Sequence, residues 1–513
     1  RRYGGSDVSG GGAGSDRSGA VKMFIPGYPP SAFPLSRHLP PLAEGVCAAY
    51  AEQHSARGDL VIDPFGQSPR PAIELARAGR RVVLASPNPV LRFALINTLN
   101  PPPPKLLRAA LTRLADARAG DARVETRLRE LYRSTCHDCG TKVDVDFFTW
   151  DKDALAEKNY YCEACGEHKL RPADPADSAL AAKHAPRGPH YYWALERLAP
   201  PDDPDREFIA SALEAYTPRA LHAIFTLTYK AQTLELTPPE RNALDLLLLM
   251  AYDEGTSLEE DHPRSLKPHT RYREKNLWLT LERLATDEAN TDGDQPAAAL
   301  LPLPDLLARR EAAVTVFDGS VRDLIKHLEP ATVPLMISAL PRRNAVLWTL
   351  SAFWVAWLWG ESAAGPVRNF ARRRRYDWAW HETALRASFS ACHKLLKPDS
   401  HFVALLPEAD PSFVGAALTA ADGADFDLVD FALRGDPMEA QFTFGVAQTF
   451  QSARAGGHAL QSLPLQTIRR CAEDTAIAVI RDRGEPVKWG LIISAAFVEL
   501  ARDHLLRAAV EQT

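Results

Sequence analysis

The stretch GDLVIDPFGQSP, residues 58–69, combines a β-strand with a turn built largely from small residues. Residues 60–62 form the short apolar run expected of a parallel strand that is covered on both faces. A nucleotide-like ligand needs close backbone approach at the carboxyl end of such a strand, and glycine permits it because it has no side chain. After Gly66, however, Gln67 and Arg70 would crowd the pocket, and Pro69 has no backbone N–H to donate. The stretch predicts a nucleotide-binding strand whose ligand loop is altered.

Composition indicates a soluble globular protein of two to four domains, because 46% of the 513 residues are hydrophobic and 24% are charged. The net charge of −5 neither supports nor excludes nucleic acid, so any DNA surface must be a local basic patch. The first 22 residues are rich in Gly and Ser and predict a disordered tail rather than a targeting segment, with Met23 as the natural start. Residues 345–360 are apolar but shorter than a membrane span, and predict a buried helix.

Two regions of alternating strand and helix patterns predict an α/β fold with a doubly wound open sheet of seven strands. The sheet would be built from two sequence-distant halves. Strands are expected over residues 60–65, 81–86, 314–317, 333–338, 402–406, 426–433 and 476–481. Helices are expected over residues 41–54, 71–78, 105–133 and 345–360.

Changes of composition along the chain predict five segments. They are a tail (1–22), a first half of the sheet domain (23–133), a cysteine module (134–175), a helical insert (176–300) and a second half of the sheet domain (301–513). Residues 286–304, rich in Ala, Asp, Thr and Pro, are expected to form a linker at the last boundary.

The cysteine module carries the most specific motif of the chain, two CxxC pairs separated by 22 residues. The pairs are Cys136 with Cys139 and Cys162 with Cys165, and a glycine follows each pair, as in the two turns of a zinc ribbon. Four thiolates close the coordination sphere of Zn²⁺, so the site is predicted to be structural. Two nearby histidines, His137 and His168, are alternative ligands, although exposed turn positions suit them better. Seven cysteines, four of them in the two CxxC pairs, fit a reducing cytoplasm with a metal site better than a disulfide framework.

Several segments together resemble the zinc-ribbon-containing DNA methylases of prokaryotes, which are related to adenine-N6 and cytosine-N4 amino-methyltransferases. The resemblance covers most of residues 28–490. The segments that carry it are FPLSRHLPPLAEGVCAAY (33–50), GDLVIDPFGQSP (58–69), YTPRALHAI (216–224), REKNLWLTLERL (273–284), LWTLSAFWVAWLWG (347–360), HKLLKPDSHFVALL (393–406) and RDRGEPVKWG (481–490). The resemblance implies a Rossmann-like, seven-stranded methyltransferase sheet split by the zinc ribbon and the helical insert.

The resemblance also implies a site for S-adenosylmethionine at the carboxyl ends of the first strands, involving Asp63, Phe65, Gly66 and Ser86. The family holds the ribose with an acidic residue after its second strand, where this chain has Ser86. A catalytic Asp/Asn/Ser-Pro-Pro-Tyr/Phe segment of the family aligns with Ser338, Ala339, Leu340 and Pro341, or one residue later. Neither register supplies the aromatic ring that stacks an extruded base. The resemblance therefore implies a retained fold with a degenerate active site.

Basic and aromatic residues gather after the apolar segment 345–360. Arg372, Arg373, Arg374 and Arg375 are followed by Tyr376, Trp378 and Trp380, and Arg342 and Arg343 precede the segment. Arginines neutralise phosphates and aromatic rings stack bases, so these six arginines are candidate DNA contacts. The alternative is a solvated helix face whose aromatic residues pack inward.

Two hypotheses follow from these observations. The first is a pseudo-methyltransferase, a non-catalytic DNA-binding or scaffolding subunit of a prokaryotic complex that contains a helicase or ATPase, such as an anti-phage defence system. The second is an active S-adenosylmethionine-dependent methyltransferase with divergent motifs that uses Ser338 or Asp63. An interaction module that binds only protein is a third reading. No membrane association is expected.

Overall fold

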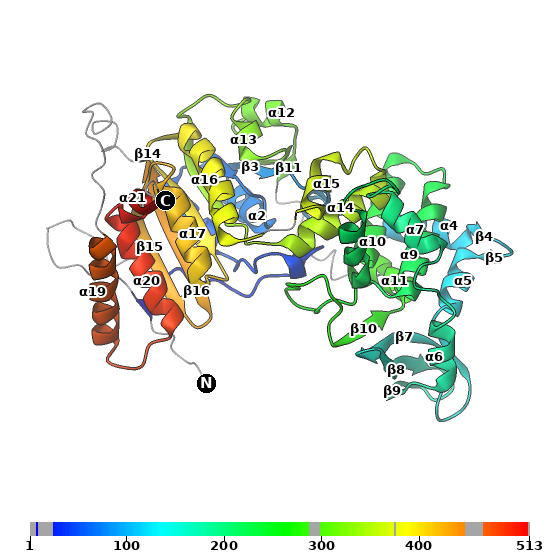
Figure 1. The fold of residues 1–513 in the computed structure, drawn as a ribbon. Coiled ribbons are helices and arrows are strands. Elements are labelled where there is room, and N and C mark those ends of the chain that lie inside the picture. Colours follow the sequence, from blue (N-terminus) through cyan, green and yellow to red (C-terminus); the bar gives the residue numbers. More distant parts are fainter. Residues whose placement is uncertain (1–6, 9–23, 287–297, 374–375, 447–464, 511–513) are drawn as a thin grey trace.

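The computed structural model describes residues 7–8, 24–286, 298–373, 376–446 and 465–510. These residues form a lobe built on a large sheet and a helical lobe beside it, with a smaller β-sheet at the far end of the helical lobe (Figure 1). The protein is therefore a mixed α/β structure, as the sequence predicts.

The large sheet is mostly parallel and has the strand order β1-β15-β16-β14-β13-β2-β3-β12-β11. Strands from β14 to β11 in this order pair in parallel, whereas β16 is antiparallel to both β14 and β15. The strands are β1 (Asp7–Val8), β2 (Leu60–Asp63), β3 (Arg81–Ser86), β11 (Ala299–Leu300), β12 (Ala313–Asp318), β13 (Val333–Ala339), β14 (Leu396–Leu406), β15 (Phe426–Gly435) and β16 (Met438–Val446). Nine strands replace the predicted seven, because two-residue strands extend both edges.

Helices cover both faces of this sheet, which explains why its central strands are apolar throughout. Val61 and Ile62 point to opposite faces, since successive residues of a strand alternate, and each is fully buried in a different cluster. One face packs on α1 (Val46–His54) and α2 (Arg70–Arg77). The other face packs on α12 (Leu303–Ala308), α13 (Val321–Leu324), α16 (Trp378–Leu395), α17 (Pro411–Asp422), α20 (Trp489–Arg502) and α21 (Leu505–Val510). The result is a three-layer arrangement.

The helical lobe is assembled from segments far apart in the sequence around one apolar core. Its core helices are α3 (Pro89–Leu99), α4 (Pro104–Asp116), α5 (Val124–Glu130), α7 (Pro189–Glu196), α8 (Arg206–Ser211), α9 (Pro218–Gln232), α10 (Pro238–Glu254), α11 (Leu277–Thr286), α14 (Ala345–Trp359) and α15 (Gly365–Ala371). Thus α14, predicted as part of the second half of the sheet domain, packs with the insert. The helical core consequently ties both halves of the chain together.

The smaller sheet contains the cysteine module and one strand from the helical insert. Its order is β10-β7-β8-β9, with β6 paired to β7. The strands are β6 (Arg133–Thr135), β7 (Lys142–Asp151), β8 (Ala154–Cys162), β9 (Glu167–Pro172) and β10 (Arg271–Lys275), and α6 (Pro175–Ala181) follows β9. Because β10 comes from a distant segment, the ribbon sheet is joined to the insert by backbone hydrogen bonds.

The predicted strand over residues 476–481 is wrong. These residues belong to α19 (Leu465–Arg483), whose Ile468, Cys471 and Val479 recur at helical spacing and pack on the sheet lobe. The seventh long strand is β16 instead, which forms a hairpin with β15. Its signal is the alternating run that follows the turn residues Asp436 and Pro437. The other six predicted strands are present.

The single helix predicted over residues 105–133 is also wrong. A tight hairpin of β4 (Arg118–Ala119) and β5 (Ala122–Arg123) separates α4 from α5. Gly120 lies in its turn at φ +73°, a backbone conformation that glycine adopts without steric cost and that ends a helix. The predicted linker falls largely on residues outside the described part of the chain, as does most of the predicted tail, of which Asp7–Val8 form β1.

The apolar segment 345–360 is a buried helix, as predicted. In α14, eleven of the fifteen residues are buried, including Trp354 and Trp357 with no exposed surface. The indole N–H groups of these two residues donate to Tyr216 Oη and to the Ala194 carbonyl. Among the described residues, no helix has both the length and the apolar character needed to cross a membrane.

Candidate metal centre and sheet-edge site

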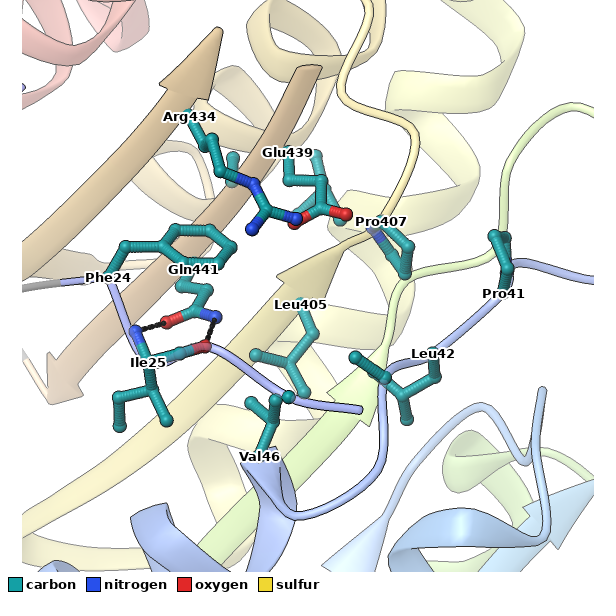
Figure 2. A pocket seen from close by; sticks show the side chains of 14 residues that line it. Phe24, Ile25, Pro41, Leu42, Val46, Leu405, Pro407, Arg434, Glu439 and Gln441 are labelled. Atoms are coloured by element: carbon teal, nitrogen blue, oxygen red, sulfur yellow. Dashed lines mark hydrogen bonds and ion pairs between the residues drawn. The ribbon is translucent and has the colours of Figure 1, made fainter. Parts of the chain in front are cut away.

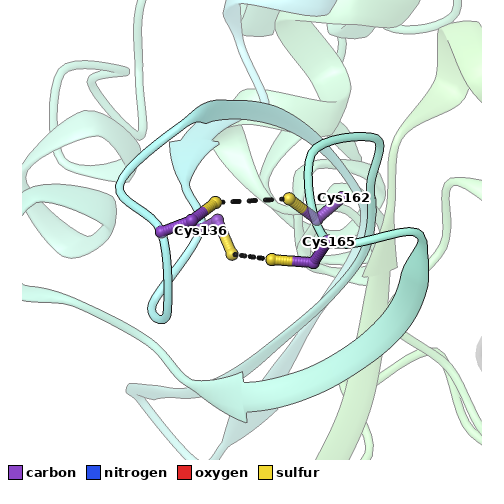
Figure 3. A group of neighbouring side chains, drawn as sticks. Cys136, Cys162 and Cys165 are labelled. Atoms are coloured by element: carbon purple, nitrogen blue, oxygen red, sulfur yellow. Dashed lines mark hydrogen bonds between the residues drawn. The ribbon is translucent and has the colours of Figure 1, made fainter.

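The four cysteines of the ribbon form a cluster that fits a tetrahedral metal ion. Their sulfur atoms all lie within 4.8 Å of one another. The Cys136 and Cys165 sulfurs are 3.9 Å apart, and those of Cys139 and Cys162 are 3.6 Å apart (Figure 3). Zn–S bonds of about 2.3 Å in a tetrahedron require sulfur separations of about 3.8 Å. The cluster therefore suits Zn²⁺ and, with four protein ligands, leaves no coordination position for a substrate.

Each CxxC pair lies in a turn that glycine completes. Gly140 and Gly166 have φ values of +75° and +71°. Their amides donate to the Cys136 carbonyl at 2.9 Å and to the Cys162 carbonyl at 2.8 Å. These turns bring the two sulfurs of each pair to one side. The spacing of the sequence motif thus specifies the local geometry.

The two alternative ligands, His137 and His168, lie outside the sulfur cluster. Their side chains are 57% and 72% exposed, and each ring lies near an aspartate. His168 also packs on the ring of Tyr161, 4.9 Å between centroids. Among the described residues, the metal cluster consists of cysteines alone, in agreement with the prediction that these histidines occupy exposed positions.

A buried lysine supports the ribbon and was not identified from the sequence. The side chain of Lys158 is fully buried, and its Nζ lies 2.8 Å from Ser134 Oγ and 3.2 Å from Asp177 Oδ2.

A tyrosine hydroxyl contacts one sulfur of the cysteine cluster. The hydroxyl of Tyr160 donates to Cys136 Sγ at 3.6 Å and accepts from the His137 amide. Hydrogen bonds of this kind to sulfur orient the ligand and disperse thiolate charge.

A buried ion pair fixes the ribbon sheet against the helical lobe. Arg219 of α9 and Glu274 of β10 each have 1% exposed side chains, and Arg219 Nη2 lies 2.5 Å from Glu274 Oε2. The guanidinium lies 4.7 Å from the Tyr132 ring centroid and 4.6 Å from that of Phe148. Because both charges are desolvated, removing either partner would leave the other uncompensated.

At the carboxyl edge of the large sheet, Asp63 and Ser338 contact each other. Asp63 ends β2, Ser338 is the penultimate residue of the neighbouring strand β13, and the Ser338 hydroxyl donates to Asp63 Oδ1 at 2.5 Å. The same oxygen accepts from the amides of Phe65 and Gly66, at 3.1 and 2.9 Å. The carboxylate therefore closes its own turn rather than facing an open pocket.

The predicted cofactor residues at this edge are closely covered. Asp63 and Ser86 are fully buried, Gly66 is buried and Phe65 is half-buried. A Cβ atom on Gly66 would lie 2.9 Å from the Ala85 carbonyl oxygen, so the loop packs directly on β3. Asp63 Oδ2 and Ser86 Oγ are buried without a hydrogen-bond partner.

Burial raises the pKa of Asp63 to about 6, although the Ser338 hydroxyl and the two loop amides favour the charged form. Desolvation disfavours a carboxylate unless a cation or enough hydrogen bonds compensate. Here the desolvation dominates, because the recorded contacts of the carboxyl group are to uncharged donors.

The substituted loop positions turn away from the strand ends. The side chain of Gln67 folds back to donate to the Phe65 carbonyl, and Ser68 Oγ accepts from the Arg70 amide at the start of α2. Arg70 forms an ion pair with Glu44 at 2.7 Å. The expectation that Gln67 crowds a ligand pocket is therefore not realised, since its side chain serves the loop itself.

The aligned catalytic tetrapeptide is part of the sheet and its covering loop. Ser338 and Ala339 end β13, and Leu340 continues the pairing by donating to the Leu405 carbonyl at 2.9 Å. Leu340 is fully buried. The Pro341 carbonyl accepts from His381 Nε2 at 2.9 Å. These four residues thus present no aromatic platform for a base.

The described candidate DNA-contacting arginines each have a different partner within the protein. Arg342 pairs with Glu408, and Arg372 pairs with Asp203. Arg343 and Arg373 stack on indole rings, each with 4.2 Å from the guanidinium carbon to the ring centroid of Trp378 or Trp380. Arg374 and Arg375 lie outside the described residues. The structure brings Arg342 and Arg343 together at one cavity of about 660 Å³, with Arg264 and Lys488.

A second, much smaller cavity lies where residues 24–25 cross the sheet. Gln441 of β16 accepts from the Ile25 amide at 3.0 Å and donates to the Ile25 carbonyl at 2.8 Å (Figure 2). The cavity beside this contact has a volume of about 40 Å³. That is room for only a few water molecules, so this contact attaches the chain to the sheet rather than forming a ligand site.

Comparison with known proteins provides no relative for this chain. No family model, no curated protein and no solved structure matches it.

Proposed function

We propose that this protein is a pseudo-methyltransferase, a non-catalytic DNA-binding or scaffolding subunit of a prokaryotic multi-protein complex. The order of the large sheet supports the methyltransferase-like part of this proposal. The strands reverse direction of winding between β2 and β13, which is where doubly wound sheets bind nucleotide ligands. In the DNA methylases that the chain resembles, S-adenosylmethionine is held at this position.

The closed edge of the large sheet is the main support for the proposal that the protein is non-catalytic. Asp63 and Ser338 end the two strands that flank the switch point, and both have no exposed surface. Their mutual hydrogen bond occupies the position where a ligand would be held. A cofactor could enter only after this contact and the packing of Gly66 on β3 were broken.

Two features support a binding role. The ribbon fits a structural metal ion, which would stabilise a rigid exposed module. The cavity at Arg342 and Arg343 provides a concentrated positive charge on a chain whose net charge is −5. Local basic sites of this kind are what phosphate recognition requires.

The test is a direct assay of cofactor binding and methyl transfer with the full chain. Calorimetric titration with S-adenosylmethionine is expected to show no binding, with or without duplex DNA. Transfer of labelled methyl groups to duplex DNA should not exceed that of an Asp63→Ala variant. Transfer by the wild type above this control would overturn the proposal.

The second candidate is an active methyltransferase with divergent motifs. It is favoured by Asp63 Oδ2 and Ser86 Oγ, two buried polar atoms without a partner at neighbouring strand ends. Unpaired buried groups are costly, and a ligand that satisfied both would recover that cost. Saturable cofactor binding that is lost in an Asp63→Asn variant would favour this candidate over the first.

A further inference from the structure

The cavity of about 660 Å³ lies at the carboxyl end of β13, where the chain enters α14. Four side chains that line it are cations, Arg264, Arg342, Arg343 and Lys488. They come from the helical insert, from the β13–α14 connection and from the segment before α20, so tertiary folding assembles the charge. Two of them, Arg264 and Lys488, are exposed, and Lys488 lies 3.2 Å from Asp436 Oδ2 in an ion pair whose side chains are 62% and 85% exposed.

Two carboxylates also line the cavity beside the four cations, and one of them pairs with the lining residue Arg342. Asp410 caps α17 by accepting from the amides of Ser412 and Phe413. Glu408 pairs with Arg342 and lies 3.5 Å from His262 Nδ1. In the described part of the chain, Arg264 has no ion-pair partner. The cavity therefore retains an excess of positive charge.

The N-terminal turn of α14 adds a second, independent attraction for an anion. Ala345 and Val346 line the cavity, while Asn344 caps the helix by accepting from the Leu347 amide. The first amides of a helix lack intrahelical partners and lie at the positive end of its dipole. Phosphate groups bind at helix N-termini for this reason.

The aromatic lining of the cavity favours recognition of phosphate over recognition of a base. Trp378 has the Arg343 guanidinium 4.2 Å from its ring centroid, and it stacks on Phe413 with 5.6 Å between centroids. The indole is thus already engaged by Arg343 and Phe413. Arg343 donates one N–H to the Tyr376 carbonyl, and a guanidinium has five N–H donors.

We propose that this cavity binds the phosphate group of an unpaired nucleotide in a nucleic-acid strand. The inference rests on the proposed DNA-binding function and specifies its ligand. A volume of this size suits a ligand of one or two nucleotide units and is too small to enclose a duplex. Arg264 and Lys488 would neutralise the charge, and the α14 amides would position the phosphate oxygens.

The proposal is tested by fluorescence anisotropy with a labelled 12-nucleotide oligothymidylate, alone or annealed to its complement. Arg264→Glu and Lys488→Glu are the test variants, since both side chains are exposed. Arg470→Glu, exposed on α19, is the matched control for reversal of one surface charge. Each test variant should weaken binding of the unpaired strand at least tenfold and lower the salt slope by about 0.7. The control should change neither quantity.

Three outcomes would overturn the proposal in distinguishable ways. Unpaired-strand binding that survives both test variants would exclude this cavity and leave the DNA-binding function standing. Binding of neither strand form by the wild type would overturn both. Equal displacement of the oligonucleotide by polyglutamate of matched charge would assign the cavity to acidic peptide instead of nucleic acid.

Discussion

Two fully buried carboxylates in this protein have opposite electrostatic surroundings. Glu274, at the junction of the ribbon and the helical lobe, contacts the Arg219 guanidinium and accepts from Thr217 Oγ1 and Trp150 Nε1. Asp63, at the sheet edge, accepts only from uncharged donors among its recorded contacts. Burial opposes ionisation at both sites, yet the pKa of Glu274 is lowered while that of Asp63 is raised to about 6.

The difference shows at which of the two sites the protein itself compensates the buried carboxyl group. At the ribbon junction the protein supplies the countercharge for its own buried group, so the contact needs nothing further. At the sheet edge the carboxylate keeps its position, but one of its oxygens has no partner. A buried polar atom in this state costs about 1–3 kcal/mol. The sheet edge therefore holds a buried carboxyl group whose hydrogen bonding is incomplete.

The largest expected effect concerns the four-cysteine cluster of the ribbon. Cys162→Ser removes a fully buried ligand, so the variant should lose bound zinc and about 5 kcal/mol or more of unfolding free energy. Elemental analysis by mass spectrometry should find one zinc ion per wild-type chain and none in the variant. Cys471→Ser, outside the cluster, is the control and should retain the metal. A variant that keeps its zinc would contradict the four-cysteine assignment.

The ion pair beneath the ribbon comes next. Glu274→Gln leaves the buried Arg219 without a countercharge, and urea denaturation should show a loss of about 4 kcal/mol. Glu260→Gln is the matched control, because its partnership with Arg273 is more than half exposed and worth little. Equal effects of the two substitutions would mean that the buried pair contributes no more than a surface pair.

The pH dependence of stability sharpens the comparison at Asp63. Its folded pKa of about 6 exceeds an unfolded value of about 3.9, so the native state binds the proton more tightly. The contribution of this group is complete below about pH 4 and is lost as the pH rises through 6, on the order of 3 kcal/mol. Asp63→Asn should remove that decline.

The measurement is urea denaturation of both proteins between pH 4 and pH 7.5. The difference in unfolding free energy between wild type and Asp63→Asn should shift in favour of the variant as the pH rises. Asp121→Asn, at a side chain that is 96% exposed, should show no such shift. Parallel curves for wild type and Asp63→Asn would mean that Asp63 does not titrate in this range.

The smallest expected effect comes from glycine substitutions that distinguish backbone strain from close packing at the loop that contains Gly66. Gly66→Ala places a Cβ 2.9 Å from the Ala85 oxygen at φ +50°, and should cost about 2 kcal/mol. Gly484→Ala has a similar φ of +62° with open space around the new atom, so it reports strain alone. In thermal denaturation, the Gly66→Ala variant should therefore have a lower melting temperature than the Gly484→Ala variant. The reverse order would argue against close packing of the loop on β3.

Local sequence patterns predicted the metal centre and most of the sheet. The CxxC spacing with Gly140 and Gly166 specifies turns within a few residues, so the four ligands could be assigned without a structure. Five of the six recognised strands, β2, β3, β12, β13 and β14, pair in parallel, and buried parallel strands read as short apolar runs. The strand prediction for residues 476–481 was wrong, because a short apolar run that packs on one face suits a helix equally well.

The cation cluster and the buried ion pair could not be derived in the same way. Arg264 and Lys488 lie more than 200 residues apart, and no periodicity connects them. Arg219 and Glu274 are likewise joined only when β10 pairs with β7. Sequence reasoning also identified Arg342 and Arg372 as candidate DNA contacts, but it had no means of finding their acidic partners Glu408 and Asp203.

The sequence by itself determined the α/β class, the four cysteines of the cluster and the buried helix α14. Each of these depends on residue types at short, regular spacing, because local backbone geometry follows from them. Only the tertiary structure decided that Asp63 is closed off by Ser338, 275 residues away, and that four cations surround one cavity. Burial and charge compensation are properties of the packed environment, and that environment is assembled from segments that the chain order keeps apart.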